Sequence, residues 1–148
     1  MNEQEFRNAI VTEAKSWVGT PYRNSGSTKK IGVNCAMFLY QVALNAKVLP
    51  ENAPKPAHYS PQFSVNQKQE RLLAVIDSYG AKVITEEQAK PGDIVVYKNG
   101  LSHGHAAIII SWPEAIIHVM GVVGCQEAHG LGGILLGMDR VFRTLWQG

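Results

Sequence analysis

The chain has 148 residues, of which 45% are hydrophobic and only 18% are charged. This length fits a single domain over residues 1–148, and the composition is typical of a globular protein rather than a disordered one. The formal net charge of +2 is too nearly balanced to indicate a nucleic-acid or membrane surface. We therefore expect no nucleic-acid binding and no membrane insertion.

The N-terminal segment argues against a secretory leader. Residues 1–18 carry charges throughout and contain no apolar core of the kind that signal peptides have. We therefore expect synthesis in the cytoplasm without a signal peptide. The only cysteines, Cys35 and Cys125, are too few for the disulfide framework of a small secreted protein or for a zinc site made of cysteines alone.

The first half of the chain has the patterns of helices. Apolar residues recur at helical spacing over residues 3–18. After a polar loop over residues 23–34, the run from Cys35 to about Ala46 is apolar nearly all round, which predicts a buried helix. Asn34 stands where the N-cap of this helix belongs, and it places Cys35 in the first turn.

The second half of the chain has the patterns of strands. A proline-rich connection over residues 50–64 precedes an amphipathic helix expected over residues 66–79. Short β-branched segments then alternate with turn residues. The expected strands are Lys82–Thr85, Asp93–Lys98, Ala106–Ser111, Ala115–Met120, Val122–Gln126 and Arg140–Leu145, with the glycine-rich stretch 130–137 as a flexible loop. Helices followed by strands indicate an α+β fold with an antiparallel sheet.

Cys35 is the strongest candidate for chemistry. The free N–H groups and the partial positive charge of a helix N-terminus favour a thiolate, which is the form of cysteine that attacks a carbonyl carbon. The same N–H groups could stabilise an oxyanion. The alternative is that Cys35 is a small buried hydrophobic residue, as free cysteines often are.

Two histidines could serve such a nucleophile, which needs a base and a group that orients the base. His105 opens one expected strand and His118 lies inside the next, so their rings can lie side by side. One would act as the base while the other holds its tautomer; the alternative is two unrelated histidines. His103 could add a metal ligand, but the spacing is not that of a zinc motif, and we expect no metal and no cofactor.

Five short motifs in order resemble the NlpC-type cysteine peptidases, which are papain-like endopeptidases of bacterial cell walls. The motifs are Trp17-Val18-Gly19-Thr20-Pro21-Tyr22, Gly32-Val33-Asn34-Cys35-Ala36-Met37-Phe38, Pro91-Gly92-Asp93 with its strand to Tyr97, His105 with its apolar strand, and Ile117-His118-Val119. The insertion with Tyr59-Ser60-Pro61 and a helix before Pro91 is similar to the phage-tail branch of this family.

The resemblance implies a papain-like fold, in which N-terminal helices pack on an antiparallel sheet and the nucleophile opens the central helix. Carried over by residue, it makes Cys35 the nucleophile, His105 the base and His118 the orienting residue, and it places Tyr22 close to the nucleophile. The implied reaction is hydrolysis of an amide in a peptidoglycan stem peptide through a thioester acyl-enzyme. The phage-tail branch further implies phage-tail proteins as partners and action at the cell wall after phage or other delivery.

Two substrate-binding positions depart from the family's pattern. Asn34 replaces an Asp, and Ala36 replaces a Ser. In cell-wall members these two residues help to bind the amine of the stem peptide, and losing the carboxylate removes a charge-assisted hydrogen bond. The substrate therefore stays open at this point. The same triad also suits an amidase, an acyltransferase or a deamidating toxin, and the fold also suits a non-enzymatic phage-tail assembly protein.

Overall fold

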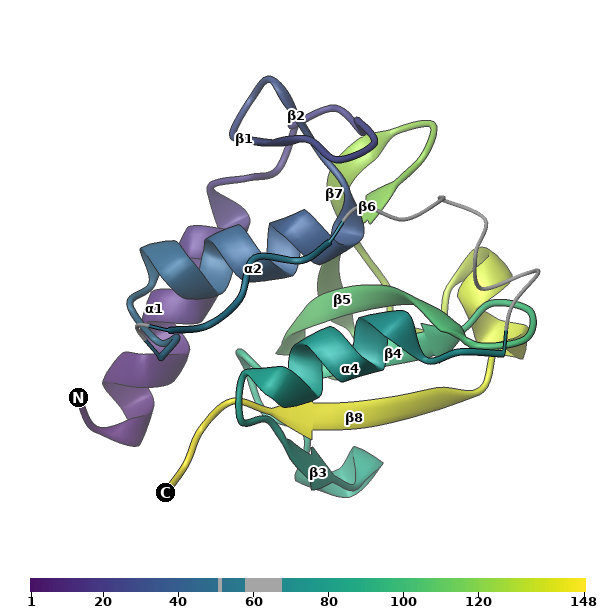
Figure 1. Ribbon diagram of the computed structural model, residues 1–148. Helices are drawn as coiled ribbons and strands as arrows, with labels where there is room; N and C mark the ends of the chain where they lie inside the picture. The colour runs from purple at the N-terminus through teal and green to yellow at the C-terminus, as the bar shows by residue number, and fades with distance from the viewer. Residues whose placement is uncertain (51, 58–67) are drawn as a thin grey trace.

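The computed structural model describes residues 1–50, 52–57 and 68–148. In this part of the chain, helices α1 (Glu3–Lys15), α2 (Cys35–Asn45) and α4 (Arg71–Ser78) precede a six-stranded antiparallel sheet (Figure 1). Its strands are β3 (Lys82–Ile84), β4 (Ile94–Lys98), β5 (His103–Ser111), β6 (Ala115–Met120), β7 (Gly124–Ala128) and β8 (Arg140–Thr144), in the spatial order β3-β8-β4-β5-β6-β7. The predicted α+β fold with its antiparallel sheet is confirmed.

The sheet separates two apolar layers. On one face the three helices pack against residues such as Ile108 and Ile117. On the other face, neighbouring residues such as Ile109 and Ile116 pack against Leu135 of a short 3-10 helix, η2 (Gly133–Gly137). The alternation follows from the two-residue period of a strand, and because both faces are covered, the central strands β5 and β6 are mostly apolar on both sides.

Helix α2 lies inside the helical layer, which explains why it is apolar nearly all round. Phe38 and Val42 have no exposed surface. The backbone N–H of Met37 donates to Oδ1 of Asn34 at 2.9 Å, so Asn34 is the N-cap and Cys35 is the first helical residue, as predicted.

The Pro91-Gly92-Asp93 motif joins α1 to the start of β4. Arg7 of α1 donates to Oδ1 of Asp93 at 2.8 Å and to the carbonyl of Pro91 at 3.0 Å, and both charged side chains are buried. Gly92 has a φ of +91°, a backbone conformation that a residue with a side chain rarely adopts, and it lies against the backbone of Arg7. This motif therefore positions the helical layer on the sheet.

Several predicted boundaries are wrong. The loop over residues 23–34 contains a small hairpin of β1 (Ser27–Thr28) and β2 (Gly32–Val33), whose two-residue strands are too short to leave a pattern in the sequence. The glycine-rich stretch forms η2 rather than a plain loop. The first helix ends at Lys15, the helix after the prolines begins only at Arg71, and β7 begins two residues later than expected.

The expected insertion motif Tyr59-Ser60-Pro61 lies outside the described residues, as does the expected start of the second amphipathic helix at residues 66–67. None of the helices in the described residues is both long enough and apolar enough to cross a membrane.

Candidate active site

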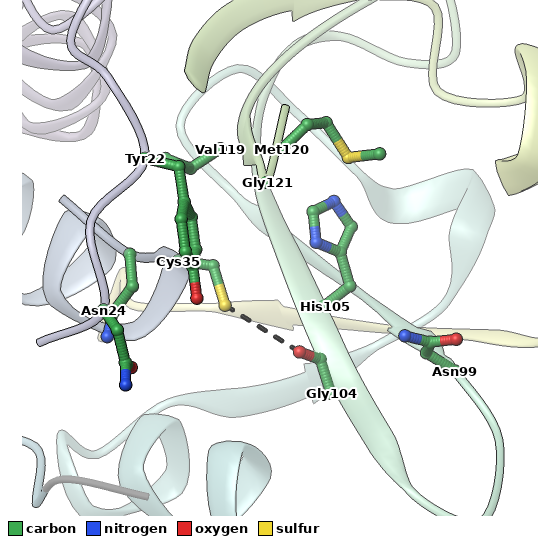
Figure 2. Close-up of a pocket in the computed structure, with 10 residues that line it drawn as sticks. Tyr22, Asn24, Cys35, Asn99, Gly104, His105, Val119, Met120 and Gly121 are labelled. Atoms are coloured by element: carbon green, nitrogen blue, oxygen red, sulfur yellow. Dashed lines mark hydrogen bonds between the residues drawn. The ribbon is translucent and has the colours of Figure 1, made fainter. Parts of the chain in front are cut away.

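Helix α2 directs Cys35 into a cavity of about 250 Å³ at one end of the sheet (Figure 2). The thiol is half-buried, whereas the second cysteine, Cys125, is buried in the core. The cavity is lined by Tyr22, Asn24, Asn34, Cys35, Asn99, Gly104, His105, Val119, Met120 and Gly121. It thus brings together the predicted nucleophile, the predicted base, and Tyr22 and Asn34.

Tyr22 reaches the cavity because the loop before it is fixed to β7. The backbone N–H of Gly19 donates to the carbonyl of Cys125 at 2.9 Å, and the N–H of Cys125 donates to the carbonyl of Thr20 at 2.8 Å. Gly124 has a φ of +77°, and a Cβ there would lie 2.4 Å from the Thr20 oxygen, so only glycine fits. The loop then bridges to β2, two residues before the nucleophile, and this contact places Tyr22 beside Cys35.

His105 and His118 lie on the neighbouring strands β5 and β6 and are hydrogen-bonded. Nε2 of His105 is 2.9 Å from Nδ1 of His118, and the two rings meet edge to face with centroids 5.1 Å apart. Tyr97 of β4 packs against the His105 ring at 5.9 Å, and its hydroxyl donates to the carbonyl of Gly130. The hydrogen bond between the two rings and the packing of Tyr97 against His105 therefore fix the orientation of the predicted histidine pair.

Burial keeps both histidines neutral. Desolvation lowers the pKa of His105 to about 3, with a further lowering from His118, and it lowers the pKa of His118 to about 4. A neutral His105 can accept a proton only at the nitrogen that faces away from His118, namely Nδ1. This tautomer requires His118 to accept the hydrogen bond at Nδ1 and to carry its own proton on Nε2, which is buried and has no hydrogen-bond partner in the part of the chain that the structure describes.

The thiol of Cys35 is protonated, contrary to the expectation that the helix N-terminus would favour a thiolate. Burial raises its pKa to about 11, although the backbone N–H groups of Ala106, Ala36 and Cys35 act in the opposite direction. The thiol donates to the carbonyl of Gly104 at 3.8 Å (Figure 2). Among the described contacts, no hydrogen bond joins Cys35 to His105, so the two share the cavity without being paired.

The two departures from the family's pattern flank the nucleophile. Asn34 uses its side-chain oxygen to cap α2, and Ala36 is buried with 2% of its surface exposed. Neither residue offers a negative charge to the cavity.

A comparison with protein families decides the identity of the domain. The model of the NlpC/P60 family matches residues 19–132, which is more than half of the chain. The chain belongs to the NlpC/P60 family. The matched segment runs from the glycine of the first motif to the region after β7, and it includes Tyr22, Cys35, His105 and His118.

One curated relative is the gamma-DL-glutamyl hydrolase of Bacillus subtilis, which is 30% identical over 101 residues. The match covers 64% of this chain but only 19% of the relative, so the chain spans about a fifth of the length of that protein. The fold of the NlpC/P60 domain is therefore shared with one part of a larger enzyme.

Solved structures of NlpC/P60 domains share the fold. The domain of the peptidoglycan hydrolase SagA matches with a TM-score of 0.58 at 20% identity, covering 91% of this chain and 96% of that one. A Staphylococcus aureus protein described as similar to a lipoprotein of this family matches with a TM-score of 0.63 at 17% identity, covering 100% of this chain and 43% of that one. A Bacillus cereus protein of the family matches with a TM-score of 0.60 at 13% identity, and the match covers 91% of this chain and 39% of that one.

Some residues of the NlpC/P60 site carry no signal in the sequence. The acceptor of the thiol proton is the main-chain carbonyl of Gly104, which any residue type could supply. Asn24, Asn99 and Met120 line the cavity from loops and a strand end, where such residues are common. Tyr97 ends the strand of the Pro91-Gly92-Asp93 motif, but its packing against His105 follows only from the strand register, which places it directly opposite His105 across the β4–β5 pair.

His103 is not part of this site. Its ring and its backbone N–H both bind the carboxylate of Glu70, the residue before α4. The register of the β4–β5 pair shifts between the pair Tyr97–His105 and the pair Lys98–His103. Because of this bulge, His103 does not continue the strand pairing that holds His105. Within the described residues, no group of three histidine, cysteine or acidic side chains is arranged to hold a metal ion.

Proposed function

We propose that this NlpC/P60 domain is a cysteine peptidase that hydrolyses amide bonds in peptides of the bacterial cell wall through a thioester on Cys35. One observation carries the proposal: the thiol at the start of α2 shares a cavity with His105, whose other nitrogen is hydrogen-bonded to His118 at 2.9 Å. A nucleophile, a base and an orienting group in this order are what acyl transfer by cysteine requires.

The reaction begins from neutral partners. The Cys35 proton moves from its contact with the Gly104 carbonyl to Nδ1 of His105 as sulfur attacks the carbonyl carbon of the substrate. A C–S bond forms, and the carbonyl π electrons move to oxygen. The first-turn N–H groups of Cys35 and Ala36 have no partner within the helix and can stabilise that oxyanion.

The intermediate then breaks down in two stages. The C–N bond breaks, and the leaving amine takes the proton from His105, which leaves a thioester on Cys35. Water attacks the thioester, its proton passes to His105, and the acid product leaves as the thiol is restored. The hydrogen bond to His118 keeps Nδ1 of His105 directed to the cavity in both stages.

Family membership supports hydrolysis and a cell-wall peptide as the substrate class. The curated relative is named a hydrolase of gamma-glutamyl bonds, and the SagA domain comes from a peptidoglycan hydrolase. The first name is that of a glutamyl hydrolase and the second that of a peptidoglycan hydrolase, and both agree with hydrolysis of a cell-wall peptide.

Product analysis with purified muropeptides tests the proposal. Wild-type protein should release a free carboxylate and a free amine in equal amounts, and Cys35→Ala should release neither. Cys125→Ala is the matched control, because it removes the other thiol, which lies outside the cavity. Release of ammonia alone, transfer of the acyl group to an added amine without hydrolysis, or full activity in Cys35→Ala would contradict the proposal.

A further inference from the structure

The tautomer in which His105 is a base puts a proton on Nε2 of His118, and no described side chain is placed to accept it. Only 3% of the surface of His118 is exposed, so solvent has little access to this N–H. A buried donor without a partner disfavours the tautomer that carries it. An acceptor beside Nε2 would therefore favour the tautomer in which Nδ1 of His105 carries no proton.

Strand β7 lies on the side of His118 where such an acceptor is needed. In the sheet, β6 runs between β5 and β7 (Figure 1). The two nitrogens of an imidazole ring point in divergent directions, so the ring that directs Nδ1 at His105 of β5 directs Nε2 away from β5. The residue of β7 directly opposite His118 in the strand register is Gln126.

Gln126 and His118 lie on the same face of the sheet. Directly opposed residues of an antiparallel pair share a face, with Cβ atoms about 4.5–5.5 Å apart. The next pair along, Ile116 and Ala128, agrees with this placement, since both pack in the apolar layer on the η2 side. Cys125, one residue before Gln126, belongs to the layer on the helical side. The side chain of Gln126 therefore leaves β7 next to the ring of His118.

The chemistry of Gln126 fits the need, and its side chain is available. A glutamine side chain has a carbonyl oxygen that accepts hydrogen bonds. Gln126 is half-buried, and within the described ranges its side-chain amide forms no hydrogen bond. Side chains with access to solvent exchange rotamers within nanoseconds, so the carbonyl can turn to Nε2 of His118 without a movement of the strand. Ala128, the other residue of β7 beyond Gln126 on this face, has no polar side chain.

We propose that Gln126 is a positioning residue for the histidine pair: its side-chain carbonyl accepts the Nε2 proton of His118 and so leaves Nδ1 of His105 free to take the proton of Cys35. Its role in turnover rests on the proposed function, but the tautomer is a property of the folded protein and needs no substrate. Gln126 does not line the cavity of Cys35, so it acts only through His118. Its loss should therefore lower kcat and leave KM unchanged.

NMR of protein labelled with ¹⁵N in its histidine rings tests the tautomer directly. A ring nitrogen with a proton and one without have well-separated chemical shifts. At pH 8 both rings are neutral, because their pKa values are about 3 for His105 and about 4 for His118. His105→Gln and His118→Asn each remove one ring and so assign the signals. In wild-type protein we expect the proton of each ring on Nε2.

Two variants of Gln126 separate the loss of the acceptor from the loss of the residue. Gln126→Met keeps the length of the side chain without a strong acceptor, and it should move the proton of both rings toward Nδ1. Gln126→Glu keeps an acceptor oxygen, and it should keep the wild-type tautomer. Thermal melting checks that both variants fold.

Steady-state kinetics on a peptide substrate gives the second readout. Gln126→Met should lower kcat about tenfold, as expected for the loss of one hydrogen bond to a buried donor, and Gln126→Glu should restore most of it. Glu127→Met is the matched control, because it puts the same side chain at an exposed position of the same strand on the other face. The positioning role is overturned if Gln126→Met keeps the wild-type tautomer, or if Glu127→Met changes the tautomer to the same extent.

The two proposals fail in different ways. If Gln126→Met moves the ring protons but wild-type protein cleaves no cell-wall peptide, the positioning role stands and the peptidase function is wrong. If wild-type protein cleaves the peptide and Gln126→Met has the same tautomer and the same kcat, the peptidase function stands and the positioning role is wrong.

Discussion

Nε2 of His105 lies 2.9 Å from Nδ1 of His118, while Nε2 of His118 is buried and has no hydrogen-bond partner among residues 1–50, 52–57 and 68–148. The tautomer in which His105 can act as a base therefore places an N–H of His118 where the described residues, as they are arranged in the structure, offer it no acceptor. An unsatisfied buried donor costs about 1–3 kcal/mol. His118 thus orients the base at an energetic cost, which makes the pair sensitive to the group at position 118.

Substitutions at this pair should reduce activity to different extents, with the largest loss at His105. Loss of the base in His105→Ala should lower kcat by at least about 10²–10⁴-fold, the usual contribution of general base catalysis. His118→Ala should retain more activity because it removes only the orienting bond. His118→Asn should retain more still, because its side-chain oxygen can accept from His105 and it leaves no buried ring N–H.

The ranking is measured by steady-state kinetics on one peptide substrate, with thermal melting to confirm that each variant folds. Equal activity in His118→Ala and wild-type protein would contradict an orienting role.

The free energy of unfolding should fall as pH falls below about 6.5. Burial lowers the pKa of His105 to about 3 and that of His118 to about 4 in the folded protein. Between pH 6.5 and pH 5 both side chains therefore stay unprotonated in the folded state, whereas in the unfolded chain they bind protons near the ordinary histidine pKa of 6.5. The unfolded state is then favoured by each proton it binds. At pH 5 the loss is about 2 kcal/mol for each histidine relative to pH 8.

Urea unfolding at pH 8 and pH 5 measures this loss. His105→Gln should show a smaller difference between the two pH values than wild-type protein, since one proton-binding group has been removed. A free energy of unfolding that rises toward pH 5 would show that the histidines are charged in the folded state.

Much of this architecture could be predicted from local sequence, and the rest depends on contacts across the chain. The N-cap at Asn34 and the strand of His118 follow from neighbouring residues, and the structure confirms both. The strand of His105 is also present, but it begins at His103, three residues before the expected start. The ionisation of Cys35 differs from the prediction, because the helix end favours a thiolate locally whereas burial under β5 and the loops outweighs it. The structural role of Asp93 also depends on a partner 86 residues away, Arg7.

The Arg7–Asp93 pair should be important for stability. Both side chains are buried, so Asp93→Asn removes the buried one of the two carboxylates that bind Arg7 and leaves only Glu3, whose side chain is partly exposed. Breaking a buried ion pair typically costs about 3–5 kcal/mol, and the remaining contact with Glu3 makes this the upper range of the expected loss. The matched control is Asp77→Asn, because Asp77 also binds an arginine, Arg143, but is about half exposed, and such pairs contribute about 1 kcal/mol or less. Urea unfolding of both variants measures the difference, and equal losses would contradict the structural role of the motif.

Cys35 should be alkylated faster than Cys125, and its rate should rise with pH. Cys35 is half-buried at a cavity, whereas Cys125 is 2% exposed and burial raises its pKa to about 12. Because burial also raises the pKa of Cys35 to about 11, its thiolate fraction grows through pH 9. Iodoacetamide labelling with peptide mapping measures both rates. A rate at Cys35 that is already constant below pH 7 would indicate a preformed thiolate.

The central claim is that Cys35 carries the acyl group of the substrate. With an activated ester of a cell-wall peptide, acylation is fast and deacylation becomes rate-limiting, so the intermediate accumulates. Acid quenching followed by peptide mass mapping should find the mass of the acyl group on the peptide that contains Cys35, with Cys125 unmodified and no adduct in Cys35→Ala. Hydrolysis of the ester without an adduct on Cys35, or the same rate of hydrolysis by Cys35→Ala, would contradict the account.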